Sequence, residues 1–319
     1  MYAVYPKEEI IVSMKVSIVI PVYNKAEYIC DCLESILQQD FEDFEILVVD
    51  DGSTDDSGRI CDEKAAQNSR IRVIHTENGG VTAARRKGVE QAVGEYIMFV
   101  DADDRLLPDA IKKLYTAITV NKADEVIGRF KTQNGDLSPI VYKDIITDVF
   151  PLVRDIVSNK NKFPILWGLI CRRDVIIDCF DIPRDIIEGE DLLTQLHILV
   201  KHPRVVFITD CVYMYTEGLP NTRKRTLELE KTYDAFLRKL LLPEWEKYEA
   251  SYVLRQIKQY HRFIIHHDYG VRQAYYDKVI PSPLPAAIPL FHKLTWYLPP
   301  VISRLMVKLY RRILGLNAI

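Results

Sequence analysis

The stretch that decides the fold is EYIMFVDADD, residues 95–104. The run from Tyr96 to Val100 is apolar and indicates a buried β-strand, and three carboxylates follow it directly, on Asp101, Asp103 and Asp104. In open α/β sheets, ligands bind at the carboxyl ends of the strands. Neighbouring acids are unfavourable unless a cation or hydrogen-bond donors compensate them. The stretch predicts either a site for Mn²⁺ or Mg²⁺, which suit a diphosphate, or an acidic turn without a ligand.

The same strand-then-helix rhythm extends over residues 15–130. Short β-branched runs at 16–20, 45–49, 71–74 and 95–100 alternate with helical patterns at 26–38, up to 67, at 81–93 and from Pro108. Such alternation with short connections is typical of βαβ units and of a parallel sheet covered on both faces. We therefore predict an α/β fold with a doubly wound, mostly parallel sheet.

Beyond residue 130 the rhythm breaks, and the chain divides into further parts. We expect residues 1–14 to be a leader without structure, with Met14 as an alternative start, and 15–216 to form one domain with halves 15–130 and 131–216. Residues 205–208 and 212–215 predict two late strands. Residues 217–319 predict a helical C-terminal region, in which the Pro-rich segment 281–300 suits a connector or a turn along the surface.

Composition restricts the partners and the compartment. A net charge of −3 gives no reason to propose nucleic acid as a partner. Six cysteines without a paired framework, and the lack of a signal peptide, favour a reducing compartment such as the cytoplasm. No stretch reaches the roughly 18 apolar residues expected of a spanning helix.

A second acidic pair, Asp50-Asp51, follows the second strand and so lies at the same sheet edge as Asp101. An Asp at this place can accept a hydrogen bond from the imide N–H of uracil or from ribose hydroxyls. Turn and N-cap chemistry is the alternative interpretation. No strand is followed by Gly-x-Gly-x-x-Gly or Gly-Lys-Ser/Thr, which argues against a dinucleotide dehydrogenase and a P-loop enzyme.

Cations gather where a helix begins after Asn78-Gly79-Gly80, at Arg85, Arg86 and Lys87. Positive charge at a helix N-terminus opposes the helix dipole, so an anion is expected nearby. Backbone N–H groups and Arg at a helix start suit a diphosphate. A solvated basic face is the alternative.

The half 131–216 contains an acidic cluster and a tryptophan that are candidates for function. The cluster Glu188-Gly189-Glu190-Asp191 opens an apolar helix, so it predicts either acids that complement the dipole or a general base. Trp167 is by default a core aromatic, and in a cleft it could stack on a sugar ring.

The tail helix, about 301–314, has two unlike sides. One carries Val301, Leu305 and Leu309, and the other carries Arg304 and Lys308. This pattern, with Trp296 and Tyr297 before it, favours peripheral contact of 296–314 with an anionic membrane, at the inner face of the cell membrane. A helix packed on the domain is the alternative.

Together these motifs resemble the inverting GT-A glycosyltransferases of family 2, of the bacterial cell-surface polysaccharide type. The resemblance is carried by, in order, VIPVYN (19–24), CLESILQQ (32–39), VVDDGSTD (48–55), NGG (78–80), AR (84–85) and GEYIMFVDADD (94–104). Trp167-Gly168 and Glu190-Asp191 extend it to about residue 216. The chain departs from the family at Arg86, where an Asn is usual, and at Glu217-Gly218-Leu219-Pro220, where a Ser-rich segment is usual.

The resemblance implies a GT-A nucleotide-diphospho-sugar transferase fold and a role for each matching residue. Nucleotide-sugar binding falls to Pro21, Tyr23, Asn24, Asp50, Asp51, Arg85, Asp101 and Ala102. Asp103 of the DXD motif would ligate Mn²⁺ or Mg²⁺, Asp191 would be the general base assisted by Glu190, and Trp167 would contact the acceptor.

We therefore expect a metal-dependent, inverting transfer of sugar from a nucleotide-sugar, with a UDP-sugar favoured, to a glycan or lipid-linked glycan. A sugar-phosphate nucleotidylyltransferase is one alternative, but Pro21-Val22-Tyr23-Asn24 is not the Gly-rich, basic signature that it needs after its first strand. A non-catalytic nucleotide- or glycan-binding protein is another, and the presence of Asp103 and Asp191 argues against it.

Overall fold

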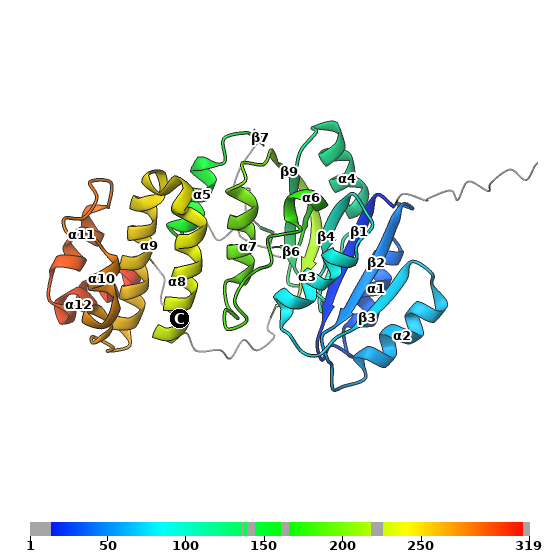
Figure 1. Cartoon of the computed structure of the whole chain (residues 1–319), viewed down its shortest axis with the longest axis horizontal. Helices are drawn as coiled ribbons and strands as arrows, with labels where there is room; N and C mark the ends of the chain where they lie inside the picture. Colours follow the sequence, from blue (N-terminus) through cyan, green and yellow to red (C-terminus); the bar gives the residue numbers. More distant parts are fainter. Residues whose placement is uncertain (1–13, 136, 139–143, 161–165, 218–225, 315–319) are drawn as a thin grey trace, which may run out of the picture. The chain divides into compact units, whose positions relative to one another are not determined.

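The computed structural model describes residues 14–135, 137–138, 144–160, 166–217 and 226–314. The predicted leader falls almost wholly outside these residues. The chain forms two compact units (Figure 1). Unit 1 comprises the described residues of 1–148 and 165–223, and unit 2 those of 149–164 and 224–319. The helix at 150–157, which the sequence placed in the half 131–216, thus belongs to unit 2, because its Phe150 ring stacks on Tyr248 with centroids 4.8 Å apart.

Four parallel strands form the first half of the sheet in unit 1, in the order β3-β2-β1-β4. They are β1 (Val16–Val22), β2 (Phe44–Asp50), β3 (Ile71–His75) and β4 (Tyr96–Phe99), and the helices α1 (Ile29–Leu37), α2 (Ser57–Gln67) and α3 (Val81–Gln91) connect them. β2 is buried along its whole length, as expected of a parallel strand between two helical layers. The predicted doubly wound arrangement is confirmed.

The second half of the sheet continues from β4 and is mixed. Its strands are β8 (Leu169–Arg172), β6 (Glu125–Thr132), β9 (Val205–Tyr215), β5 (Arg105–Leu106) and β7 (Asp144–Ile146). β8 runs antiparallel to β4 and β6, and β9 runs parallel to β6. The two late strands expected at 205–208 and 212–215 are one strand, β9, because register shifts around Arg129 let the pairing with β6 resume after the interruption.

Helix α3 lies unusually close to β1, and a glycine makes this possible. A Cβ on Gly88 would stand 2.2 Å from Cγ1 of Val19, closer than two carbons can approach. Gly88 therefore fixes the depth of α3 against the sheet. It also fixes the place of Arg85, one turn earlier on the same helix. The remaining helices of unit 1 are α4 (Ala110–Val120), α6 (Arg173–Ile176) and α7 (Glu190–Leu199).

Unit 2 is helical and is packed with aromatic rings. Its elements are α5 (Phe150–Val157), α8 (Leu227–Leu241), η1 (Leu242–Glu244), α9 (Trp245–Ile265), η2 (Arg272–Tyr276), α10 (Asp277–Val279), α11 (Leu290–Tyr297) and α12 (Pro300–Ile313). Tyr248, Tyr252, Tyr260 and Tyr276 are fully buried. The connector expected at 281–300 is wrong in part, because residues 290–297 form α11 and bury Trp296. Among the described residues, no helix has the length and apolar character needed to cross a membrane.

Candidate active site

A cleft of about 730 Å³ opens at the carboxyl edge of the first-half strands. Five segments of unit 1 line it: the end of β1 and the residues after it, the residue after β2, the turn and first residues of α3, the residues after β4, and the approach to α7 with its first turn. Nine of the predicted site residues are among its lining residues: Pro21, Tyr23, Asp51, Arg85, Asp101, Ala102, Asp103, Glu190 and Asp191. The topology thus gathers at one place residues that lie far apart in the sequence.

Asp51 holds the turn that leads into α3. Its Oδ1 accepts from the amide of Gly79 at 2.7 Å, and its Oδ2 accepts from the amide of Gly80 at 2.8 Å. Gly80 has φ +89°, a conformation that other residues adopt only with strain. The turn chemistry expected of this acid is therefore present, and the carboxylate also borders the cleft, where a nucleotide base could meet it.

Asp50 and Asn24 are not among the described residues that line the cleft. Oδ2 of Asp50 lies 2.9 Å from Nδ1 of His75, and its Oδ1 accepts from the amide of Ser53. Burial would raise the pKa of Asp50, but the hydrogen bonds from Ser53 and His75 outweigh it and keep this pKa below its usual range. Asn24, at φ +53°, accepts from the amide of Thr54 at 2.8 Å. Both residues join the loops behind the cleft.

Arg85 is the cation at the centre of the site, and its side chain is only 3% exposed. Its Nη2 donates to Oδ1 of Asp101 at 2.9 Å, and its Nη1 donates to Oδ1 of Asp191 at 2.5 Å. Burial alone would lower the pKa of Arg85, but the carboxylates of Asp191 and Asp101 raise it well above its usual range. The anion expected at this helix start is thus supplied by two acids of the protein itself.

Asp104 accepts hydrogen bonds that hold the DXD loop, residues 101–104, in place. The hydroxyl of Tyr213 on β9 donates to Oδ2 of Asp104 at 2.8 Å and accepts from the amide of Asp101 at 3.0 Å. The amide of Thr216 donates to Oδ1 of Asp104 at 2.7 Å. Burial, with the charge of Asp101, raises the pKa of Asp104 to about 7. Sequence reasoning missed Tyr213 and Thr216, since nothing in one sequence pairs residues about 110 positions away with the loop.

Asp103 has a different kind of partner. Its Oδ2 lies 2.5 Å from Nζ of Lys25, which borders the same cleft. Sequence reasoning also missed Lys25, although its position directly after the first strand, at the edge that carries Asp103, is a signal. Lysine is a mobile point charge, so this partner can move away more readily than Arg85 can leave Asp101.

The described residues offer few side chains that could ligate a metal ion. Among the described residues, no group of three or more His, Cys, Asp or Glu side chains is placed to hold one. Mg²⁺ is commonly bound by one or two carboxylates together with substrate phosphates. Asp103 borders the cleft and fits this mode.

Glu190 and Asp191 form the first turn of α7, after Gly189 at φ +83°. Burial and the charge of Asp191 raise the pKa of Glu190 to about 7, although Arg85 opposes the shift. The acids complement the helix dipole and also line the cleft, and the general base stays a prediction. A lining residue that the sequence did not suggest, Arg184, donates to the carbonyl of Asn78 at 2.7 Å and joins the two sides of the cleft.

Trp167 lies in the core of unit 1. It is 7% exposed, and its ring stacks on Tyr213 and on Tyr215, with centroids 4.6 and 5.2 Å away. It is not among the described residues that line the cleft. The core position expected by default is therefore what the structure has, and contact with an acceptor stays a prediction.

The sequence model of "Glycosyl transferase family 2" matches residues 17–180, half of the chain, so the chain belongs to this family. It is 46% identical over 116 residues to "Glycosyltransferase GlyG" of Streptococcus pneumoniae serotype 4, which covers 36% of this chain and 38% of that protein. It is 38% identical over 157 residues to the "Poly(ribitol-phosphate) beta-glucosyltransferase" of Bacillus spizizenii, covering 48% and 24%. The chain thus matches well under half the length of these relatives.

The fold is similar to that of a solved structure. The crystal structure of S. aureus TarS 1-349 in complex with UDP-GlcNAc superposes with a TM-score of 0.73 at 20% identity. The likeness covers 94% of this chain and 92% of that one. The GT-A arrangement expected from the motifs is confirmed.

Proposed function

We propose that the cleft binds a nucleotide-diphospho-sugar and transfers its sugar to an acceptor hydroxyl. The observation that carries this proposal is the presence of Asp103 and Asp191 in one cleft, one suited to the donor's diphosphate and the other to a hydroxyl proton. Membership of Glycosyl transferase family 2 supports it. The donor is a UDP-sugar, as in the TarS complex with UDP-GlcNAc.

The donor lies along the edge formed by the ends of β1, β2 and β4. Pro21, Tyr23 and Asp51 border the base, and Tyr23 is 47% exposed, so its ring is available for contact. Asp101 and Ala102 meet the ribose, while Asn24 and Asp50 shape the pocket through the loops that they join. Asp103 would hold Mn²⁺ or Mg²⁺. When bound, the ion neutralises the charge that develops on the leaving diphosphate.

The reaction is a single in-line displacement. Asp191 accepts the proton of the acceptor hydroxyl, and the oxygen attacks the anomeric carbon on the side opposite the leaving group. The bond from that carbon to the diphosphate oxygen breaks, and UDP leaves with the electron pair, so the anomeric configuration inverts. Arg85 orients Asp191, and Glu190 beside it positions the acceptor or its loop.

The acceptor is a hydroxyl of a glycan or of a lipid-linked glycan, and Trp167 supports the acceptor side. Polysaccharide acceptors are supported by the name of the Bacillus spizizenii relative. The protein acts in the cytoplasm at the inner face of the cell membrane. The absence of disulfides supports a reducing compartment, since all six cysteines are free.

The test measures UDP release from a panel of UDP-sugars, with Mn²⁺ or EDTA and with candidate acceptors. We expect release that depends on Mn²⁺ and on acceptor, together with a rise in melting temperature on donor binding. A nucleotidylyltransferase would instead release pyrophosphate from a nucleoside triphosphate. A binding protein would show the thermal shift without turnover. If Asp103→Ala and Asp191→Ala proteins released UDP as fast as the parent, the proposed roles would be wrong.

A further inference from the structure

Helix α12 turns its apolar side toward solvent. Its buried positions are Ser303 and Val307, whereas Leu305, Leu309 and Ile313 are 59, 61 and 73% exposed. A surface helix of a globular protein normally buries its apolar stripe against the core. Packing on unit 2 uses a different side of α12, so it does not account for this stripe.

Helix α11 presents the same kind of side chain. Leu290, Leu294 and Tyr297, at helical spacing, are 71, 45 and 55% exposed, while Trp296 is buried. The two helices are joined, because the hydroxyl of Ser303 donates to the carbonyl of Thr295 at 2.6 Å. The α11–α12 set is the name used here for their exposed apolar residues: Leu290, Leu294, Tyr297, Val301, Ile302, Leu305, Leu309, Tyr310 and Ile313.

Exposed apolar residues are concentrated in this part of the chain. Of the nineteen large hydrophobic side chains that are exposed among the described residues, ten lie between residues 290 and 314. Single exposed apolar residues are normal, whereas a concentration of them marks an interaction surface. The α11–α12 set is therefore a candidate interaction surface.

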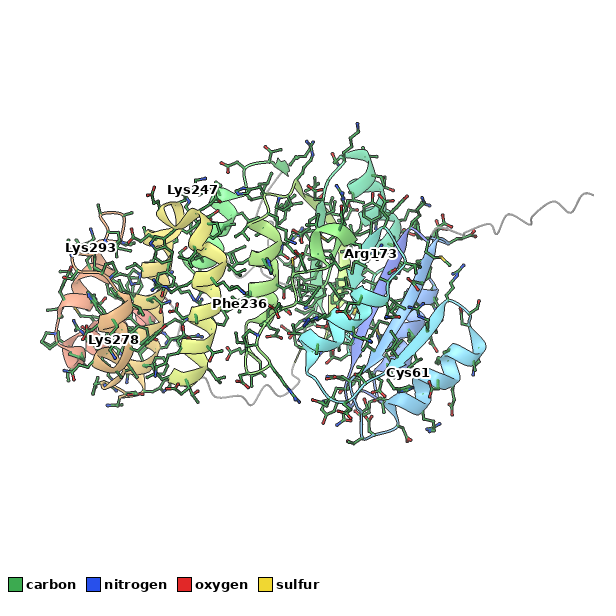
Figure 2. The ribbon with its side chains drawn as sticks, viewed as in Figure 1. Cys61, Arg173, Phe236, Lys247, Lys278 and Lys293 are labelled. Atoms are coloured by element: carbon green, nitrogen blue, oxygen red, sulfur yellow. The ribbon has the colours of Figure 1, made fainter. Side chains whose placement is uncertain are left out.

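The positive charge of the segment that carries the α11–α12 set indicates which kind of partner it binds. From residue 278 to the end the sequence has six basic residues and no acidic one. Lys308 and Arg312 are exposed and follow Leu305 and Leu309 by three residues, so they flank the apolar stripe. Lys278 and Lys293 belong to the same region of unit 2 (Figure 2). An apolar surface whose own segment carries only positive charge is complementary to an anionic, apolar one.

We propose that the α11–α12 set binds an anionic lipid surface. The apolar side chains enter the boundary between headgroups and acyl chains, and Lys308 and Arg312 remain at the headgroups. A second copy of the chain is a poorer partner, because it would bring two sets of like charges together. The inference extends the contact expected at 296–314 to α11, and it does not depend on the proposed reaction.

The test is flotation of the full chain with vesicles of phosphatidylcholine, alone or mixed with phosphatidylglycerol. We expect the protein to float with the mixed vesicles and to remain largely free with phosphatidylcholine. Leu305→Glu and Leu309→Glu should each lower binding by at least roughly tenfold, because each places a charge where an apolar group enters the lipid. Lys308→Gln and Arg312→Gln should each lower it by about fivefold, and by less at high salt.

Matched controls lie on α4 of unit 1. Val120→Glu changes a side chain that is 75% exposed, and Lys112→Gln removes an exposed charge, so both should float like the parent. Melting curves verify that every variant is folded. Parent protein that stays free of mixed vesicles, or Leu305→Glu protein that floats as the parent does, overturns the proposal. So does a parent dimer that Leu305→Glu dissociates without any vesicle binding, because the set would then be a contact between copies.

Flotation and UDP release report on different proposals. In solution without vesicles, Leu305→Glu and parent protein should release UDP at the same rate, since Leu305 lies in unit 2 and the cleft is lined by unit 1. Flotation without turnover would contradict only the proposed reaction. Turnover without flotation would contradict only the membrane surface.

Discussion

Arg85 donates a hydrogen bond of 2.5 Å to Asp191, although 106 residues separate the two in the sequence. The same guanidinium bonds Asp101 of the DXD loop. The buried guanidinium of Arg85 thus links Asp191, which we propose to be the general base for the acceptor, with Asp101, which we propose to bind the donor. The relative position of the two carboxylates is set by the fork of the guanidinium, so it does not depend on the loops alone.

Replacement of Asp191 by Asn tests the general base. Asn has nearly the same shape but cannot take the hydroxyl proton, so UDP release should fall by between about a hundredfold and ten-thousandfold. Donor binding, measured by thermal shift, should change little. The control is Asp185→Asn, an exposed acid on the approach to α7, which should leave turnover unchanged. Equal losses in both variants would show a disturbed loop and not a missing base.

Replacement of Arg85 by Lys tests the link between the two acids. A lysine keeps the charge but lacks the planar fork that bonds both carboxylates. We expect the free energy of unfolding to fall by about 2 kcal/mol, the order of one hydrogen bond to a charged group, and turnover to fall at least tenfold. Urea unfolding and UDP release measure the two effects. Arg86→Lys, one residue along and exposed, should stay within about 0.5 kcal/mol of the parent.

Removal of the metal tests the role of Asp103. UDP release should be lost in EDTA and restored by Mn²⁺ in the parent. The Asp103→Ala protein should not recover at Mn²⁺ concentrations that saturate the parent, because Asp101 and Asp191, which remain in the cleft, are already paired with Arg85. Asp56→Ala removes an exposed acid near α2 and is the control. Full recovery of Asp103→Ala at the parent's Mn²⁺ concentration would assign the ion to other ligands.

A methyl group on Gly88 tests the packing that places Arg85. Gly88→Ala should destabilise the protein by about 2 kcal/mol, since overpacking against Val19 exceeds the gain in helix propensity. Gly270→Ala is matched to it, because nothing lies within 4 Å of the added carbon there, and it should be nearly neutral. Denaturant midpoints compare the two. A neutral Gly88→Ala would mean that α3 can withdraw from β1 freely.

The pH dependence of stability should reflect Glu125, which is fully buried at the start of β6. Burial raises the pKa of Glu125 to about 8, although a hydrogen bond from Gln195 opposes the shift. The folded state therefore binds this proton up to higher pH than the unfolded state, so Glu125 lowers the free energy of unfolding as pH rises from about 4.5 to 8. The Glu125→Gln protein, measured by urea unfolding, should gain stability over the parent across this window.

The control for this window is Glu42→Gln, which changes an exposed carboxylate. It should leave the pH dependence of the parent unchanged. Parallel pH curves for the parent and the Glu125→Gln protein would contradict the prediction.

The parallel half of the sheet and most of the cleft could be predicted from the sequence, because each strand and the polar residues after it are local signals. Asp51, Arg85, Asp101 and Asp103 each follow a recognisable run. The partners of these residues could not be predicted in the same way. Tyr213 and Arg184 reach the site through contacts that only the fold creates, whereas Lys25 follows the first strand closely in the sequence. The single strand β9 was missed because the polar residues Thr209 and Asp210, between its two apolar runs, look like the end of a strand.

The solvent-facing side of α12 shows a different limit. The sequence pattern gave two unlike sides, but it could not say which of them packs on the protein. The structure decides this through Ser303 and Val307, which are small or short and yet are the buried positions. The spacing of apolar residues defines the two sides of a helix, but only the tertiary contacts show which side is buried.

The hydrogen bonds of the Tyr213 hydroxyl limit which substitutions the loop at residues 101–104 can tolerate. It ties the DXD loop to β9, and Thr216 adds a second tie just beyond the strand. A substitution that moves the end of β9 would also move the loop that carries Asp101 and Asp103. The loop should therefore tolerate changes at Tyr213 or Thr216 less well than changes that leave these two ties in place.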